Sequence, residues 1–162
     1  GIFVYELKYP SGELKAVSGP IGKLLNPAFL VTNAFHNPQM LYYMSEKRES
    51  RIGCIQINFD PSATATNGLT FRELSPIVGG DAHLHMGRDG LLYGADYMKG
   101  KFEVFETNPV SGLVESRVCV FVNKEAGTLG VPERQEHSHA HCIMPHWKNP
   151  WSAYGVDLGT DK

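Results

Sequence analysis

Apolar and polar residues alternate along short stretches of this chain, and turn-forming residues separate the stretches. The clearest case is the range 51–59, in which Cys54 and Gln56 fall on one face. Ile55 and Ile57 fall on the opposite face. Alternation with a period of two is typical of a β-strand with one buried face. No stretch sustains apolar residues at helical spacing over four turns behind a capping residue, so the pattern predicts an all-β protein.

The strand pattern recurs as a unit. Three similar segments, each a turn glycine followed by a strand, contain Gly12, Gly68 and Gly112, and each follows an apolar strand pattern. The first two glycines are 56 residues apart and the second pair 44. Blades of four strands repeat about every 40–50 residues in propellers, with loops absorbing the variation. The repeat therefore predicts a β-propeller of four-stranded antiparallel blades. A one-domain β-sandwich is the alternative, but its strands would not recur in units of four.

The expected blades divide the chain, which we take as a single propeller segment spanning residues 1–162. The parts are the end of one blade (1–25), a second blade (26–78), a third blade (79–122), a loop (123–138) and the start of a fourth blade (139–162). For the second blade we expect strands at 28–33, 40–46, 52–59 and 69–75. We expect two strands in the first part, four in each of the second and third blades and two in the last part, which together make about three blades.

Closed propellers have about four to eight blades, so this segment would leave strand edges open at both ends. One explanation is that the chain is part of a longer protein whose C-terminal blades close the ring. The other is closure by self-association. In a two-fold dimer, residues 139–159 of one copy would complete the blade begun by residues 1–18 of the other.

The composition of the chain limits the kinds of molecule that it is expected to bind. The chain has 162 residues, is 42% hydrophobic and carries 15 basic and 17 acidic residues, for a net charge of −2. This balance argues against a nucleic-acid or membrane partner, and no apolar run reaches the roughly 20 residues of a membrane span. The first residues lack the basic stretch of a signal peptide, so we expect that they are not an intact one. Three scattered cysteines, at positions 54, 119 and 142, predict reduced thiols and a cytoplasmic location.

Four stretches of the chain resemble one protein family. They are residues 1–5 with 11–14, residues 26–30 leading to 43–46, residues 83–84 with 89–97, and residues 134–141 followed by 157–162. The last, RQEHSHAH followed by DLGTDK, is the most specific. In this order they resemble the N-terminal portion of the lactonase family of seven-bladed propellers. That family contains the propeller-type 6-phosphogluconolactonases and the fungal carboxymuconate cyclases.

The resemblance implies hydrolysis of a sugar lactone, with 6-phosphogluconolactone as the expected substrate and no cofactor. Such a reaction needs a base that activates water and a cation that holds the substrate anion. By resemblance, His141 occupies the catalytic histidine position of the cyclase branch and is the first choice for the acid/base, with His139 second. Arg134 is the expected anion clamp, because a guanidinium group fits phosphate. Gln135 and His83 are the other expected substrate-binding residues.

Other interpretations stay open at this point. His139 and His141 are two residues apart and would share a face of a strand, so with His137 they could form a zinc site. The resembled lactonases are not known to require a metal, and we expect none here. His83 fits a scaffold role as well as a site role. A lactone-forming cycloisomerase is the alternative enzyme, and a non-catalytic binding or assembly propeller is the alternative from another class.

Two further groups of polar residues are expected to be structural. Glu46, Asp96 and Asp157 recur at equivalent strand ends, which favours carboxylates that accept backbone N–H bonds in tight turns. His36 and His146 lie in turns and are expected to be exposed.

Overall fold

The computed structural model describes residues 1–21, 26–46, 50–64, 68–125, 127, 130–149 and 151–162. The expected blade boundary at residue 25, and residues 126, 128 and 129 of the expected loop, lie outside this description. In chain order the strands are β1 (Ile2–Lys8), β2 (Glu13–Ile21), β3 (Pro27–Asn33), β4 (Asn37–Ser45), β5 (Arg51–Phe59), β6 (Leu69–Val78), β7 (His83–Met86), β8 (Leu91–Asp96), β9 (Lys101–Thr107), β10 (Val114–Val122), β11 (Ala140–Pro145) and β12 (Ala153–Asp157).

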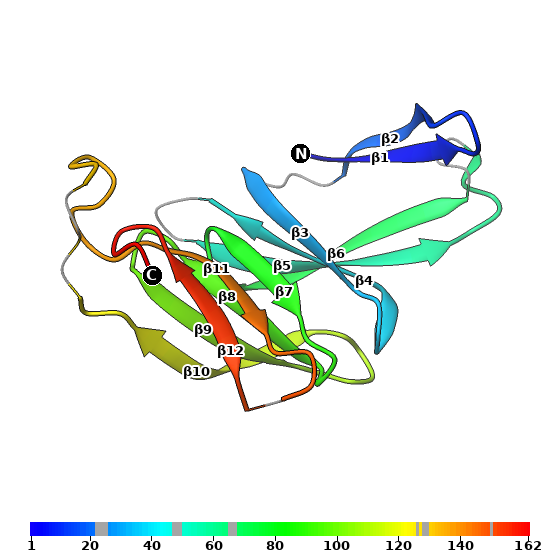
Figure 1. Cartoon of the computed structure of the whole chain (residues 1–162). Helices are drawn as coiled ribbons and strands as arrows, with labels where there is room; N and C mark the ends of the chain where they lie inside the picture. Colours follow the sequence, from blue (N-terminus) through cyan, green and yellow to red (C-terminus); the bar gives the residue numbers. More distant parts are fainter. Residues whose placement is uncertain (22–25, 47–49, 65–67, 126, 128–129, 150) are drawn as a thin grey trace.

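The strands form four antiparallel sheets (Figure 1). The first sheet is β1–β2, the second β3–β6, the third β7–β10 and the fourth β11–β12, and within each the strands follow chain order. A four-stranded meander of this kind is the blade of a propeller. The all-β class expected from the sequence is therefore confirmed. No helix in the described ranges is long and apolar enough to cross a bilayer.

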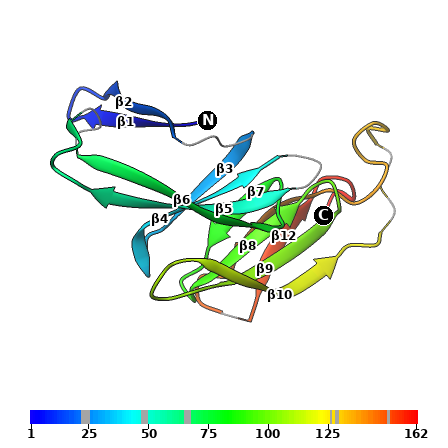
Figure 2. The ribbon, with the colours of Figure 1, turned by 180° about the vertical axis from the view of Figure 1, so that it is seen from behind.

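The first strand of the third sheet contacts the first strands of the second and fourth sheets, and β11 also contacts β8. Strand β7 contacts β3 on one side and β11 on the other, and the sheets fan out from these three strands (Figures 1 and 2). Residues that begin these strands are consequently brought together although they are far apart in the sequence.

Apolar side chains from facing sheets join each sheet to the next. The largest cluster lies between the second and third sheets and consists of Met40, Tyr42, Met44, Ile52, Cys54, Leu84, Met86, Leu92 and Phe105. A second cluster joins the first sheet to the second through Ile2, Ile21, Tyr43 and Ile55. Tyr93, Ala95, Ala140 and Ile143 join the third sheet to the fourth. Each large side chain buried in this way stabilises the fold by about 1.5–3 kcal/mol, so the contacts between sheets fix where the loops lie.

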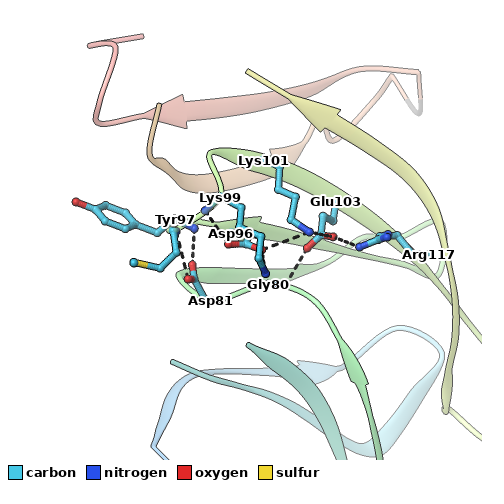
Figure 3. A network of polar contacts seen from close by, with 9 residues as sticks. Gly80, Asp81, Asp96, Tyr97, Lys99, Lys101, Glu103 and Arg117 are labelled. Carbon is cyan, nitrogen blue, oxygen red and sulfur yellow. Dashed lines mark hydrogen bonds and ion pairs between the residues drawn. The ribbon is translucent and has the colours of Figure 1, made fainter. Parts of the chain in front are cut away.

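A buried ion network holds the third sheet and the turn that precedes it (Figure 3). Asp96 and Glu103 have fully buried side chains. The Lys101 ammonium lies between them, 3.4 Å from Asp96 Oδ2 and 2.6 Å from Glu103 Oε1. Arg117 reaches the same Glu103 oxygen at 2.6 Å. The second oxygen of Glu103 accepts a 2.9 Å hydrogen bond from the Gly80 N–H, so the network anchors the start of β7.

The network predicts how folding stability depends on pH. Burial alone would raise the pKa of Glu103, but the hydrogen bond from Lys101, and then those from the Gly80 N–H and Arg117, hold that pKa below its usual value. A carboxyl whose pKa is lowered by folding adds stability above its unfolded pKa of about 4.3, and this stability disappears as the pH falls through the folded value. We therefore expect the free energy of unfolding to fall on acidification below about pH 4.3.

Urea unfolding across this pH range, compared between the wild type and Glu103→Gln, measures the contribution of Glu103. The variant should show a shallower loss of stability in acid, because its side chain cannot take up the proton. Glu133→Gln, a change at an exposed loop residue, is the matched control and should keep the wild-type slope. Equal slopes in the wild type and Glu103→Gln would contradict the assignment.

Candidate functional site

A cavity opens where the three central strands begin. Its volume is about 450 Å³, within the range of about 300–1,000 Å³ that is usual for small-ligand sites. Its walls come from the starts of β3, β7 and β11, from the connections that follow β4 and β8, and from the loop before β11. The lining residues are Ala28, Glu46, Asp81, Ala82, Tyr97, Met98, Arg134 and His141.

Two of the expected site residues meet in this cavity. Arg134 comes from the loop before β11 and His141 from the second position of β11, and both are exposed. Among the described side chains, no carboxylate forms an ion pair with the Arg134 guanidinium. The cavity therefore offers a guanidinium that could bind an anion and an imidazole that could act as acid/base, which are the two groups that the lactone-hydrolase interpretation requires.

Tyr97 lies between the two expected catalytic histidines. Its ring stacks on His139 with centroids 4.2 Å apart, and it meets His141 edge-on at 6.1 Å. The sequence placed both histidines on one strand face, but β11 begins only at Ala140, so His139 precedes the strand. His139 is only 4% exposed, and its Nδ1 lies 3.1 Å from the Tyr97 carbonyl. It is therefore behind Tyr97 and outside the cavity lining.

Gln135 is buried and its amide is hydrogen-bonded within the protein. Its Nε2 donates to the Leu158 carbonyl at 3.0 Å and to Asp161 Oδ1 at 2.5 Å. Its Oε1 accepts a hydrogen bond from the Val131 N–H at 2.8 Å. These bonds tie the loop before β11 to the turn after β12, so Gln135 supports the position of Arg134 and does not face the cavity.

His83 lies between the central strands. Its ring centroid is 4.6 Å from that of Phe29 in β3, and its Nδ1 accepts a 3.4 Å hydrogen bond from the Ile143 N–H in β11. Burial, together with the nearby His85 and His141, lowers the pKa of His83. A neutral imidazole that joins three strands fits the scaffold interpretation better than a substrate-binding role.

Asp81 is a cavity residue that the sequence did not reveal. It is 3% exposed and precedes β7, and its carboxylate accepts hydrogen bonds from the Tyr97 N–H and, at 3.3 Å, from the Met98 N–H (Figure 3). Burial, and then the charge of Asp96, raises its pKa. The sequence feature that could have pointed to Asp81 is the pair of glycines that precedes it, because paired glycines often mark a tight turn. Gly80 has a φ of 56°, a conformation that glycine adopts without strain.

The expectation for the strand-end carboxylates is confirmed for two of three residues. Asp96 Oδ1 accepts a 3.1 Å hydrogen bond from the Lys99 N–H. Asp157 Oδ1 accepts hydrogen bonds from three backbone N–H groups at 2.9–3.1 Å, those of His139, Gly159 and Thr160. Glu46 differs, because its side chain is exposed at the cavity wall.

Both turn histidines take part in hydrogen bonds with backbone groups, His36 with a distant turn and His146 within its own turn. His36 is exposed, as expected, although its Nε2 lies 2.9 Å from the Arg88 carbonyl. His146 is only partly exposed, because its Nδ1 accepts the N–H groups of Lys148 and Asn149 at 3.1 and 2.9 Å.

Comparison with solved structures agrees with this architecture. A protein from Bacteroides fragilis, provisionally named a 6-phosphogluconolactonase, matches with a TM-score of 0.79 and 23% identity over 99% of this chain and 42% of its own. A Lactobacillus plantarum protein matches with a TM-score of 0.77 and 23% identity over 99% of this chain and 43% of its own. A Bacteroides uniformis protein, provisionally named in the same way as the first, matches with a TM-score of 0.77 and 20% identity over 98% of this chain and 43% of its own.

These structures support the fold, and the chain spans less than half the length of each. No curated protein sequence matches the chain significantly. The model of the family described as lactonase, 7-bladed β-propeller, matches all of residues 1–162. The chain therefore belongs to the lactonase family of seven-bladed β-propellers.

Proposed function

We propose that the protein containing this chain hydrolyses a sugar lactone in the cavity lined by Arg134 and His141, with 6-phosphogluconolactone as substrate. The observation that carries the proposal is that one cavity of ligand size is lined by an exposed imidazole and by a guanidinium for which the described residues supply no ion-pair partner. Family membership and the provisional names of two structural neighbours support the same reaction class.

In the proposed reaction, the neutral imidazole of His141 takes a proton from water as the water oxygen attacks the lactone carbonyl. The bond between the carbonyl carbon and the ring oxygen then breaks, and the protonated imidazole returns a proton to that oxygen. The products are a carboxylic acid and a hydroxyl group, and the histidine is unchanged. Histidine suits both steps because it gains and loses a proton near neutral pH.

Arg134 is assigned to the substrate phosphate. A guanidinium presents two parallel N–H donors that match phosphate oxygens, and such charged hydrogen bonds contribute about 1.5–3 kcal/mol each. Asp81 holds the backbone of Tyr97 and Met98 and so fixes the part of the cavity wall that these two residues form. We assign it a positioning role.

Replacement of Arg134 tests the assignment of the phosphate. For Arg134→Gln in the whole protein, we expect KM for 6-phosphogluconolactone to rise by about 10- to 100-fold, because a charged hydrogen bond is lost. KM for the unphosphorylated gluconolactone should change little. Steady-state hydrolysis of both lactones measures the difference, and Arg72→Gln, at an exposed position on β6, is the control.

Three results would count against the proposal in different ways. An equal rise in KM for both lactones would show that Arg134 does not bind the substrate phosphate. Formation of a lactone from a carboxymuconate, without hydrolysis of either sugar lactone, would indicate the cycloisomerase. The absence of turnover with all three compounds would favour a binding or assembly propeller.

A further inference from the structure

We propose that Glu136, His137 and His139 bind a zinc ion beside the cavity. Their potential ligand atoms all lie within 4.8 Å of one another. Glu136 Oε1 is 3.1 Å from His139 Nε2 and 3.4 Å from His137 Nε2. The site is separate from the residues assigned to lactone hydrolysis, and the proposal does not depend on that function.

The hydrogen bonds of the two imidazoles fix which nitrogen atoms carry hydrogen. His139 Nδ1 lies 3.1 Å from the Tyr97 carbonyl, and His137 Nδ1 lies 2.8 Å from the Ser138 carbonyl. A carbonyl oxygen only accepts hydrogen bonds, so in both residues Nδ1 must be the donor. In a neutral imidazole the lone pair is then on Nε2. Both Nε2 atoms face the Glu136 carboxylate, as metal-ligand atoms when the ring is neutral and as hydrogen-bond donors when it carries a second proton.

His139 Nε2 and Glu136 Oε1 are at hydrogen-bond distance, so a proton shared between them and a metal ion at the centre of the three ligand atoms are alternatives, and metal binding would release that proton. In a tetrahedral zinc site, bonds of about 2.0–2.2 Å place neighbouring ligand atoms about 3.3–3.5 Å apart. The two Glu136 distances, 3.1 and 3.4 Å, are close to this spacing. Metal-binding histidines usually donate their other N–H to a carbonyl or carboxylate, and both histidines here do so.

The exposure of the three side chains suits an ion that enters from solvent. The His139 side chain is 5% exposed, whereas those of His137 and Glu136 are 53% and 46% exposed. A buried ligand gives the ion a fixed position, and the exposed side leaves room for water as a fourth ligand. Two imidazoles and one carboxylate favour zinc over magnesium or calcium, which prefer oxygen ligands.

This set of ligands differs from both expectations drawn from the sequence, no metal or a site of three histidines. His141 lines the cavity and meets Tyr97 edge-on, and Glu136 takes its place in the cluster. The Tyr97 ring stacks on His139, so an ion held here would brace the wall of the cavity that Tyr97 forms.

Calorimetric titration of untagged, EDTA-treated whole protein with zinc chloride tests the proposal. We expect one zinc ion per chain and no response to magnesium chloride. His137→Ala and Glu136→Gln, both at exposed positions, should weaken this binding by at least about 100-fold, since each removes a direct ligand. His141→Ala and His36→Ala should bind zinc as the wild type does. Cobalt(II) in place of zinc should give the strong visible absorption of a tetrahedral site in the wild type and lose it in His137→Ala.

Melting curves in EDTA should show that each variant is folded before titration. Zinc should then raise the Tm of the wild type and of His141→Ala but not that of His137→Ala. The proposal is overturned if the wild type binds no zinc at millimolar concentration, or if His137→Ala and Glu136→Gln keep the wild-type affinity. If His141→Ala loses zinc binding while Glu136→Gln keeps it, the ligands are the three histidines 137, 139 and 141, and the proposed site is wrong.

Discussion

Replacing His141 by alanine is expected to lower kcat/KM for lactone hydrolysis by about 10²- to 10⁴-fold, the usual contribution of a general acid/base. The imidazole is exposed at the start of β11, so its removal should change the free energy of unfolding by no more than about 0.5 kcal/mol. Steady-state hydrolysis of the lactone by the wild type and the variant measures the effect.

Two controls separate catalysis by His141 from other effects. His36→Ala removes an exposed histidine elsewhere and should keep wild-type activity. His139→Asn tests the second-choice residue, and here we expect a smaller loss of rate than in His141→Ala, since His139 is buried behind Tyr97. If His139→Asn loses more activity than His141→Ala while circular dichroism shows an intact fold, His139 and not His141 is the acid/base residue.

Replacing Lys101 by methionine is expected to lower the free energy of unfolding by about 3–5 kcal/mol, as when one partner is removed from a buried ion pair. Methionine keeps most of the length of the side chain but leaves Asp96 and Glu103 without the cation between them. Asp96 then keeps the Lys99 ammonium at 3.3 Å and Glu103 keeps Arg117, both on partly exposed side chains, and a buried charge left with weaker partners costs more than the loss of a surface ion pair. Urea unfolding followed by tryptophan fluorescence or circular dichroism measures the change.

Lys124→Met is the matched control, because Lys124 is exposed, and it should change stability by no more than about 0.5 kcal/mol. A cost below about 1 kcal/mol for Lys101→Met would mean that Lys99 and Arg117 compensate for the lost ammonium group. That result would contradict the central place given to Lys101 in the network.

The strands were largely predictable because each blade buries alternate side chains. The expected strand 52–59 is confirmed as β5, which begins one residue earlier at Arg51, since its apolar positions face neighbouring sheets. The expected strand 69–75 was too short. Strand β6 continues to Val78, where it still pairs with Arg51, although the sequence contains a proline at position 76. β6 is the outer strand of its sheet, where a proline is tolerated, and the register between β5 and β6 shifts between Ile52 and Cys54.

The candidate site was predictable only where its residues are close in the sequence. Arg134 and His141 lie seven positions apart in one motif, and the structure places both in the cavity. Asp81 could not be found in this way, because its contacts are with backbone groups of a different turn. Lys101 and Glu103 alternate along β9 like residues of a solvated strand face, and only the packing of the third sheet shows that the carboxylate is buried.

The Tyr97 ring lies between the proposed ion site and the cavity. Its ring contacts His139 on the side of the proposed ion site and His141 on the side of the cavity. Free-energy coupling between two binding sites is reciprocal, so a ligand that shifts this ring changes the affinity at the other site by the same factor. Under the two proposals above, ion binding at residues 136–139 and lactone binding in the cavity are expected to be linked equilibria, and a titration of either ligand in the presence of the other measures the linkage.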